Sequence, residues 1–180
     1  MATDSLRSLA RYLDIPERTL RRAAAEGLIR GERLSPRRYR TSLREEAFLR
    51  KRWPLLRGLR DALRTEPNVR LAILFGSQAT GTATERSDVD LLVALVDSGA
   101  SRVAELAERL ERHSGRDVQL VRLQDVDQAP GLMADVLESG RVLVDRDGRW
   151  PQLRSEADAS RSRAAAAEVP LENAMPDLDL

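Results

Sequence analysis

Two short polar motifs, ten residues apart, are the part of this sequence best suited to chemistry. Gly76-Ser77 directly follows the apolar run Val69–Phe75, and Asp88 and Asp90 flank the start of the next apolar run. In a strand, residues two apart point to the same face, so Asp88 and Asp90 direct two carboxylates toward one place. Converging carboxylates repel one another unless a cation lies between them, and oxygen ligands near phosphates suit Mg²⁺.

The glycine and serine suit the other half of such a site. Gly76 lets the backbone approach a phosphate closely, and the following amides and the Ser77 hydroxyl can donate to its oxygens. Phosphoryl transfer needs a phosphate cradle and a magnesium clamp, because it depends on positioning and charge neutralisation. Either motif alone is typical of a turn or a solvated loop. Together, each beside an apolar run, they indicate a nucleotide site.

The elements that must position these motifs alternate between strand and helix. The expected strands cover 69–75, 89–96, 117–123 and 141–144, and the expected helices cover 101–113 and 132–137. Strands that alternate with helices predict a layered α/β or α+β domain.

The chain before this domain has a helical period. Leu6, Leu9 and Leu13 lie on one helix face, and a second helix is expected from Pro16 to Glu26, ended by Gly27. Two short helices with a tight turn make a helix-turn-helix. A small hairpin or wing is expected over 30–40. Ser42 and Glu45 form a capping box that opens a further helix, which Pro54 is expected to break or kink.

Charge divides the chain. Residues 1–70 hold 18 Arg and Lys against 9 Asp and Glu, whereas residues 71–180 hold 12 against 20. A basic block before an acidic one suggests two units, the first with a polyanionic partner; the alternative is charge compensation within one domain. We expect units at 1–66 and 67–150, and at 151–180 a helix followed by a disordered tail.

Composition excludes several classes of protein. The chain has no cysteine and one histidine, which excludes disulfides and thiol catalysis and disfavours a Ser-His-Asp triad or a His-rich zinc site. No apolar run approaches the roughly 20 residues of a membrane helix, and the N-terminus lacks a secretory signal. We therefore expect a cytoplasmic protein without a membrane partner.

The spacing from Gly76-Ser77 to Asp88-Val89-Asp90 resembles the signature of the polymerase-β-like nucleotidyltransferases, especially the minimal bacterial type, over roughly residues 69–150. The resemblance implies a small mixed sheet with helices on one side, two Mg²⁺ ions, and ATP or another NTP as donor of a nucleotidyl group to a hydroxyl. It implies that Gly76 and Ser77 bind the triphosphate and that Asp88 and Asp90 are catalytic and hold the metals. Small members resemble the antitoxin half of toxin–antitoxin pairs, in which the domain can adenylylate its partner. The acceptor could equally be another protein, an RNA or a small molecule.

One position departs from the family pattern. The family has a third carboxylate on the next strand, where this chain has Gln119. Glutamine carries no charge and cannot act as a base. Asp117 shares its face but lies about 6.6 Å away along the strand. The alternative to an enzyme is therefore a weak or inactive nucleotidyltransferase-fold regulator that binds DNA and a partner protein.

The basic N-terminal segment looks like the winged DNA-binding domains of MerR-type regulators. That resemblance implies that Arg18, Arg21, Arg22 and Arg38 face DNA bases or phosphates. The alternatives are a basic helix pair that packs on the catalytic domain, or one that grips an RNA or other acceptor. The expected fold is thus α+β, an N-terminal all-α winged helix-turn-helix followed by a nucleotidyltransferase α/β domain with a small mixed sheet.

Overall fold

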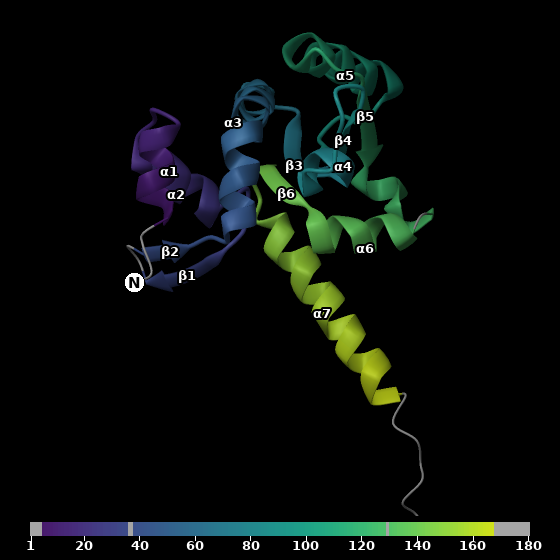
Figure 1. The fold of residues 1–180 in the computed structure, drawn as a ribbon. Helices are drawn as coiled ribbons and strands as arrows, with labels where there is room; N and C mark the ends of the chain where they lie inside the picture. The colour runs from purple at the N-terminus through teal and green to yellow at the C-terminus, as the bar shows by residue number, and fades with distance from the viewer. Residues whose placement is uncertain (1–4, 36–37, 129, 168–180) are drawn as a thin grey trace, which may run out of the picture. The chain divides into compact units, whose positions relative to one another are not determined.

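The computed structural model describes residues 5–35, 38–128 and 130–167. Its compact units are residues 1–147 and 148–180. The elements run in this order (Figure 1): α1 (Ser5–Tyr12), α2 (Glu17–Ala25), β1 (Glu32–Ser35), β2 (Arg38–Arg40), α3 (Leu43–Arg64), β3 (Val69–Phe75), α4 (Gly76–Thr80), β4 (Val89–Leu95), α5 (Ala100–Ser114), β5 (Val118–Arg122), the 3₁₀ helix η1 (Leu123–Gln128), α6 (Pro130–Ser139), β6 (Arg141–Asp145) and α7 (Arg149–Ala167).

The first two helices form a tight pair. Leu6, Leu9 and Leu20 are fully buried. Helix α2 ends at Ala25, and Gly27, two residues later, has a φ of 87°, the left-handed conformation that glycine adopts readily. An antiparallel pair of strands, β1 and β2, follows, and the Tyr39 hydroxyl donates to the carbonyl of Ile29 at 3.1 Å. The hairpin expected here is present, so this segment is not all helical.

Helix α3 connects the N-terminal segment to the sheet. Its capping box is confirmed, because the Ser42 side chain accepts from the amide of Glu45 at 3.1 Å. The break expected at Pro54 is wrong: α3 continues through it for 22 residues. Leu49, Leu56, Leu59 and other apolar side chains along α3 are buried, and this packing outweighs the loss of one backbone hydrogen bond.

The main sheet has four strands in the order β5-β4-β3-β6. Strands β4 and β5 are parallel, whereas β3 is antiparallel to both β4 and β6, so the expected small mixed sheet is confirmed. Strand β3 has the predicted bounds, and the other strands differ from them by one or two residues. Strands β3 and β4 are the two central strands. Because Phe75, the last residue of β3, pairs with Asp90 near the start of β4, the two polar motifs meet at one end of these strands.

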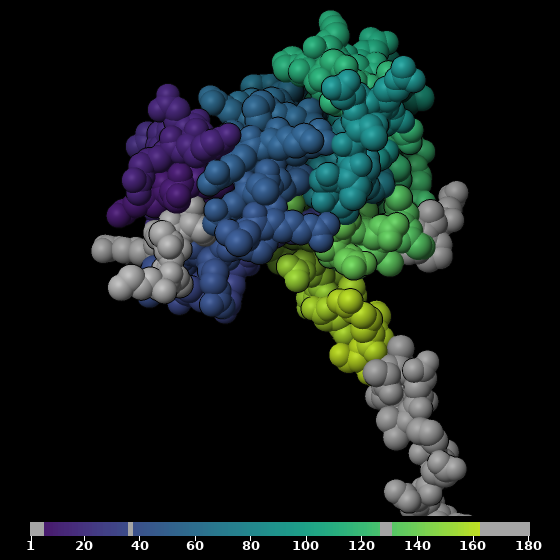
Figure 2. Space-filling model, in the orientation of Figure 1, coloured from purple at the N-terminus to yellow at the C-terminus, as the bar shows by residue number. Residues whose placement is uncertain are grey.

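Helices cover both faces of the sheet. Leu59 of α3 and Leu106 of α5 belong to one apolar cluster with Leu74 and Leu91 of the sheet. Helix α6 contacts β3, and Gly140 at its end lies against Ile73, whose side chain points to the opposite face from that of Leu74. The expectation that the helices lie on one side of the sheet is therefore wrong. In the space-filling view, α3 lies between the purple N-terminal helices and the teal β3–α5 segment (Figure 2).

The second unit contains α7, which begins at Arg149, two residues before the range 151–180 in which a helix is expected. The tail predicted to follow it, 168–180, lies outside the described residues. No helix in the described part of the chain is both long and apolar enough to cross a membrane.

Candidate functional site

The site begins where β3 turns into the short helix α4. Gly76 has a φ of 67°, the left-handed region that disfavours L side chains. A Cβ atom at this position would lie 2.5 Å from Oδ2 of Asp90. Glycine is therefore required twice, by backbone conformation and by the close approach of the carboxylate. Ser77 is half-buried, and its carbonyl accepts from the amides of Gly81 and Ala83 at 3.0 and 3.1 Å, which fixes the turn after α4.

Asp88 and Asp90 lie at the start of β4, and both are half-buried. Burial, together with the negative charge of Asp88, raises the pKa of the Asp90 carboxyl above its usual range. Since Asp88 contributes to this shift, the two carboxylates are close enough to repel one another. The structure therefore brings Gly76 and Asp90 together, with Asp88 two residues before Asp90.

Gln119 occupies the position beside Asp90 on the neighbouring parallel strand. Its amide nitrogen donates to Oδ2 of Asp88 at 3.0 Å, so an amide donor stands where the resemblance places an acid. Asp117 is exposed, and its carbonyl accepts from the amide of Val89 at 2.9 Å. In the described residues, no group of three or more His, Cys, Asp or Glu side chains is placed to hold a metal ion.

Two residues that the sequence reasoning missed hold the loop between the motifs. The buried Gln78 side chain donates to the carbonyl of Ser87 at 3.0 Å, next to Asp88. Arg116 donates to the carbonyls of Glu85 and Ser87 at 2.6 and 3.3 Å. Nothing in the local sequence distinguishes these side chains from ordinary surface residues, since their acceptors are backbone atoms of a distant loop.

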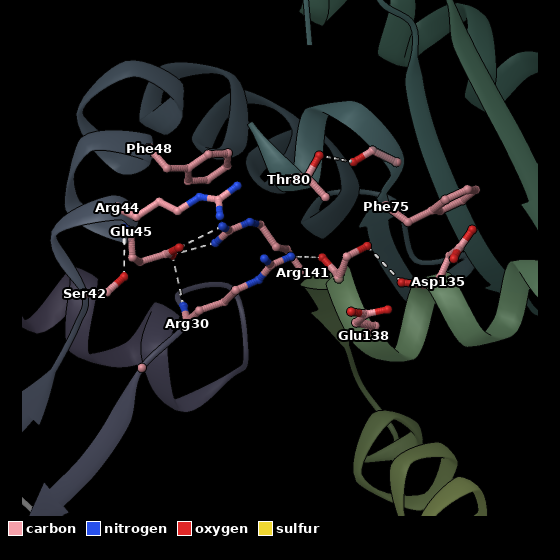
Figure 3. A pocket seen from close by; sticks show the side chains of 13 residues that line it. Arg30, Ser42, Arg44, Glu45, Phe48, Phe75, Thr80, Asp135, Glu138 and Arg141 are labelled. Atoms are coloured by element: carbon pink, nitrogen blue, oxygen red, sulfur yellow. Dashed lines mark hydrogen bonds and ion pairs between the residues drawn. The ribbon is translucent and has the colours of Figure 1, made fainter. Parts of the chain in front are cut away.

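A cavity of about 680 Å³ lies beside Gly76. Gly76, Phe75 and Thr80 line it from the β3–α4 turn, and α3 and α6 provide two of its other walls (Figure 3). It lies wholly within residues 1–147.

The floor of this cavity contains a buried ion pair, which sequence reasoning also missed. Arg141 and Glu45, with side chains 2% and 6% exposed, are joined by hydrogen bonds of 2.6 and 2.8 Å. Arg141 also donates to the carbonyls of Ala79 in α4 at 2.8 Å and Leu28 at 3.1 Å, and its guanidinium stacks over the Phe48 ring. One side chain thus ties together α3, α4 and the turn after α2.

The four arginines predicted to contact DNA do not have equal surroundings. Arg18, Arg22 and Arg38 are exposed, whereas Arg21 is half-buried. Arg21 forms an ion pair with Glu17, and Arg22 forms one with Glu26, the residue after α2. Arg37, next to Arg38, lies outside the described residues.

The donor set fits a divalent cation at the two aspartates. Burial first, and then the negative charge of Asp88, raise the pKa of the Asp90 carboxyl, so the two carboxylates repel one another when both are ionised. A cation bound by both would remove this repulsion. The absence of a side chain at Gly76 lets the Asp90 carboxylate lie directly against the backbone of the β3–α4 turn, the turn at which the sequence predicts a bound phosphate. The geometry is therefore that of a metal and phosphate site with two carboxylates.

Comparison with solved structures finds proteins of similar fold. A solved toxin–antitoxin structure with AMP-PNP aligns with 62% of this chain and 90% of its own, at 25% identity and a TM-score of 0.50. A mutant of the MntA–HpeT toxin–antitoxin aligns over the same shares of the two chains, at 24% identity and a TM-score of 0.50. The complex of a tri-AMPylated Shewanella oneidensis HEPN toxin with MNT antitoxin aligns with 63% of this chain and 88% of its own, at 23% identity and a TM-score of 0.46.

Among curated proteins, none matches this chain. The protein-family model described as "Polymerase beta, Nucleotidyltransferase" matches residues 58–149, which is just over half of the chain. This range contains the whole four-stranded sheet and both polar motifs. The chain belongs to the polymerase β nucleotidyltransferase family.

Proposed function

We propose that this protein is a Mg²⁺-dependent nucleotidyltransferase that transfers an NMP group from an NTP, ATP in the first instance, to a hydroxyl group of a partner protein. The observation that carries the proposal is the close approach of Gly76 to Asp90, with Asp88 beside it. The likeness to a toxin–antitoxin structure with AMP-PNP supports ATP as donor and a toxin as acceptor. The chain's lack of cysteine suits a cytoplasmic site of action.

In the proposed reaction, the acceptor oxygen forms a bond to the α-phosphorus of the NTP. The bond from that phosphorus to the bridging oxygen of the β-phosphate breaks, and pyrophosphate leaves. Asp88 and Asp90 would hold Mg²⁺, which supplies charge neutralisation when bound. Gly76 and Ser77 position the triphosphate. Because Gln119 cannot accept the hydroxyl proton, that proton passes to solvent or to a base on the acceptor.

Labelled ATP tests this proposal. With Mg²⁺ and the protein encoded next to this chain, the wild type should transfer label from [α-³²P]ATP to that protein. The Asp88→Ala, Asp90→Ala double variant should transfer none. Equal labelling by wild type and double variant would refute the assignment of the two aspartates.

The Gln119 amide favours a second candidate, a regulator whose nucleotidyltransferase fold binds nucleotide or partner without turnover. The amide occupies an oxygen of Asp88, and no third carboxylate is present at this position. The Gln119→Asp variant separates the two candidates. Labelling by the variant alone would identify the wild type as a degenerate enzyme, whereas labelling by both would identify an active one.

We further propose that residues 1–66 bind DNA, through Arg18 and Arg38 foremost, because these two side chains are exposed, whereas Arg21 and Arg22 already form ion pairs with Glu17 and Glu26. Gel shifts on the DNA upstream of the gene, compared with tRNA of similar length, test this. Binding should weaken with salt, since contacts to phosphates release counterions. The Arg18→Ala, Arg38→Ala double variant should bind the DNA more weakly and with a smaller salt dependence. A preference for tRNA would favour an RNA-holding role instead.

A further inference from the structure

Nearly half of the residues that line the cavity beside Gly76 lie outside the family match. Arg30, Ser42, Arg44, Glu45 and Phe48 line it, and all of them precede residue 58, where the match begins. The N-terminal segment therefore contributes a wall to a space that adjoins the candidate nucleotide site. About 680 Å³ is within the range of ordinary ligand pockets.

One wall of the cavity carries excess positive charge. Arg30, Arg44 and Arg141 point into the same space (Figure 3), and Glu45 is the acidic side chain among them. Arg44 is exposed and forms no ion pair with a residue that the structure describes. Burial lowers the pKa of Arg30 below its usual range, and the charges of Arg141 and Arg44 lower it further. The guanidinium groups are thus close enough to repel each other, and a bound anion would relieve this repulsion.

The facing wall carries the opposite charge. Asp135 and Glu138 of α6 line the cavity across from α3 (Figure 3), and both are exposed. Carboxylates accept hydrogen bonds from hydroxyl and amino groups and repel phosphates. The cavity therefore selects a ligand that is anionic at one end and rich in hydrogen-bond donors at the other. A nucleotide has both, in its phosphates and in its ribose hydroxyls and base.

The walls are held rigidly enough to select a ligand. Arg141 and Glu45 are buried and fully engaged with each other, and Arg30 donates to the carbonyl of Ser139 at the end of α6. The amide of Arg30 also donates to Glu45 at 3.0 Å. These contacts fix the separation of α3 and α6, and preorganisation of this kind favours binding.

We propose that the donor nucleotide of the proposed reaction lies across this cavity, with its phosphates between Gly76 and the side chains of Arg44 and Arg30, and with its sugar and base toward Asp135 and Glu138. This inference rests on the proposed function, and it adds that the N-terminal segment completes the nucleotide site. Arg44 is then a binding residue for the phosphates, and the two α6 carboxylates distinguish a nucleotide from inorganic triphosphate.

Calorimetry with two probes tests the assignment. The probes are the Mg²⁺ complexes of α,β-methylene-ATP, which cannot release pyrophosphate, and of inorganic triphosphate. Arg44→Ala should weaken binding of both probes by roughly tenfold or more, the usual size of a hydrogen bond to a charged group. The Asp135→Asn, Glu138→Gln double variant should weaken binding of α,β-methylene-ATP and leave binding of inorganic triphosphate unchanged. All three side chains are exposed, so the variants should fold, as thermal melts would verify.

Matched controls are available on the same kinds of surface. Arg57→Ala removes an exposed arginine from α3, and Glu108→Gln removes an exposed carboxylate from α5. Neither residue lines the cavity, so both variants should bind the two probes like the wild type.

The outcomes separate this inference from the function on which it rests. If Asp88→Asn abolishes nucleotide binding but the Arg44 and α6 variants change nothing, the nucleotide site stands and the cavity assignment falls. An α6 variant that weakens both probes equally also overturns the assignment of sugar and base to that wall. If the wild type binds neither probe, the proposed function fails, and the cavity assignment fails with it.

Discussion

At the scale of single residues, the surroundings of Asp90 disfavour the charged form of its carboxyl group. The pKa of the Asp90 carboxyl is raised by burial and by Asp88, so the folded protein holds a proton on Asp90 more tightly than the unfolded chain does. Stability from this group is therefore greatest at low pH and is lost as the pH rises from the ordinary value toward the raised one. At neutral pH the ionised carboxylate is a cost to folding, which a bound cation would offset.

We expect Asp90→Asn to stabilise the metal-free protein at neutral pH, because the amide removes both the repulsion from Asp88 and the burial of a charge. The melting temperature should rise by about 2 °C or more. Mg²⁺ should raise the melting temperature of the wild type and leave that of the variant unchanged. Thermal melts with and without Mg²⁺ measure this, and a variant that melts below the wild type would contradict the stated cause of the pKa shift.

At the scale of elements, the junction of β3 with α4 determines whether the site exists. The strand ends where Gly76 takes a left-handed conformation, and the pairing of Phe75 with Asp90 sets the carboxylate against the glycine. A residue with a Cβ would meet both a backbone penalty and a contact of 2.5 Å with Asp90.

Gly76→Ala should therefore lower the free energy of unfolding by more than the strain of its backbone conformation alone would. Gly115 ends α5 with a similar φ of 64°, and no atom lies within 4 Å of the Cβ position there. Gly115→Ala should cost about 1–2 kcal/mol from the backbone, whereas Gly76→Ala should cost more and should lose Mg²⁺ and nucleotide binding. Urea unfolding and calorimetry provide the two readouts. Equal costs for the two variants would show that Asp90 moves aside freely.

At the scale of the whole described unit, Arg141 connects segments that lie far apart in the sequence. It pairs with Glu45 of α3 and donates to carbonyls of Leu28 and Ala79. Because both charges are buried, removing one partner leaves the other without compensation. The same network joins the N-terminal segment to α4, the helix that begins with Gly76-Ser77.

Arg141→Met should lower the free energy of unfolding by about 3–5 kcal/mol, as expected when one partner of a buried ion pair is lost. The Arg141→Met, Glu45→Met double variant should be less destabilised than Arg141→Met alone. The matched control is Arg70→Met, because Arg70 pairs with Asp147 at the surface, where a pair contributes about 0–1 kcal/mol. Urea unfolding of the four proteins checks this, and similar losses for Arg141→Met and Arg70→Met would contradict the role of burial.

The strands and helices of residues 69–145 follow from local pattern, and the structure differs from the expected bounds by a few residues. Apolar runs between turn residues define β3 and β4, and the spacing of leucines defines α5. Pro54 misleads, because the packing of α3 along its length outweighs a local preference. The placement of helices on both faces could not be predicted, since it depends on which leucines meet which strands.

For the candidate site, the sequence was enough to choose the residues: Gly76-Ser77 and Asp88-Val89-Asp90 match the family signature in spacing and in their flanking apolar runs, and Gln119 departs from the family pattern. Tertiary structure alone decided the surroundings. Gln78, Arg116 and Arg141 act on backbone carbonyls and on Glu45 across 9 to 113 positions of sequence. Such contacts leave no periodic trace in a sequence, because they depend on how separate elements pack rather than on how one element repeats.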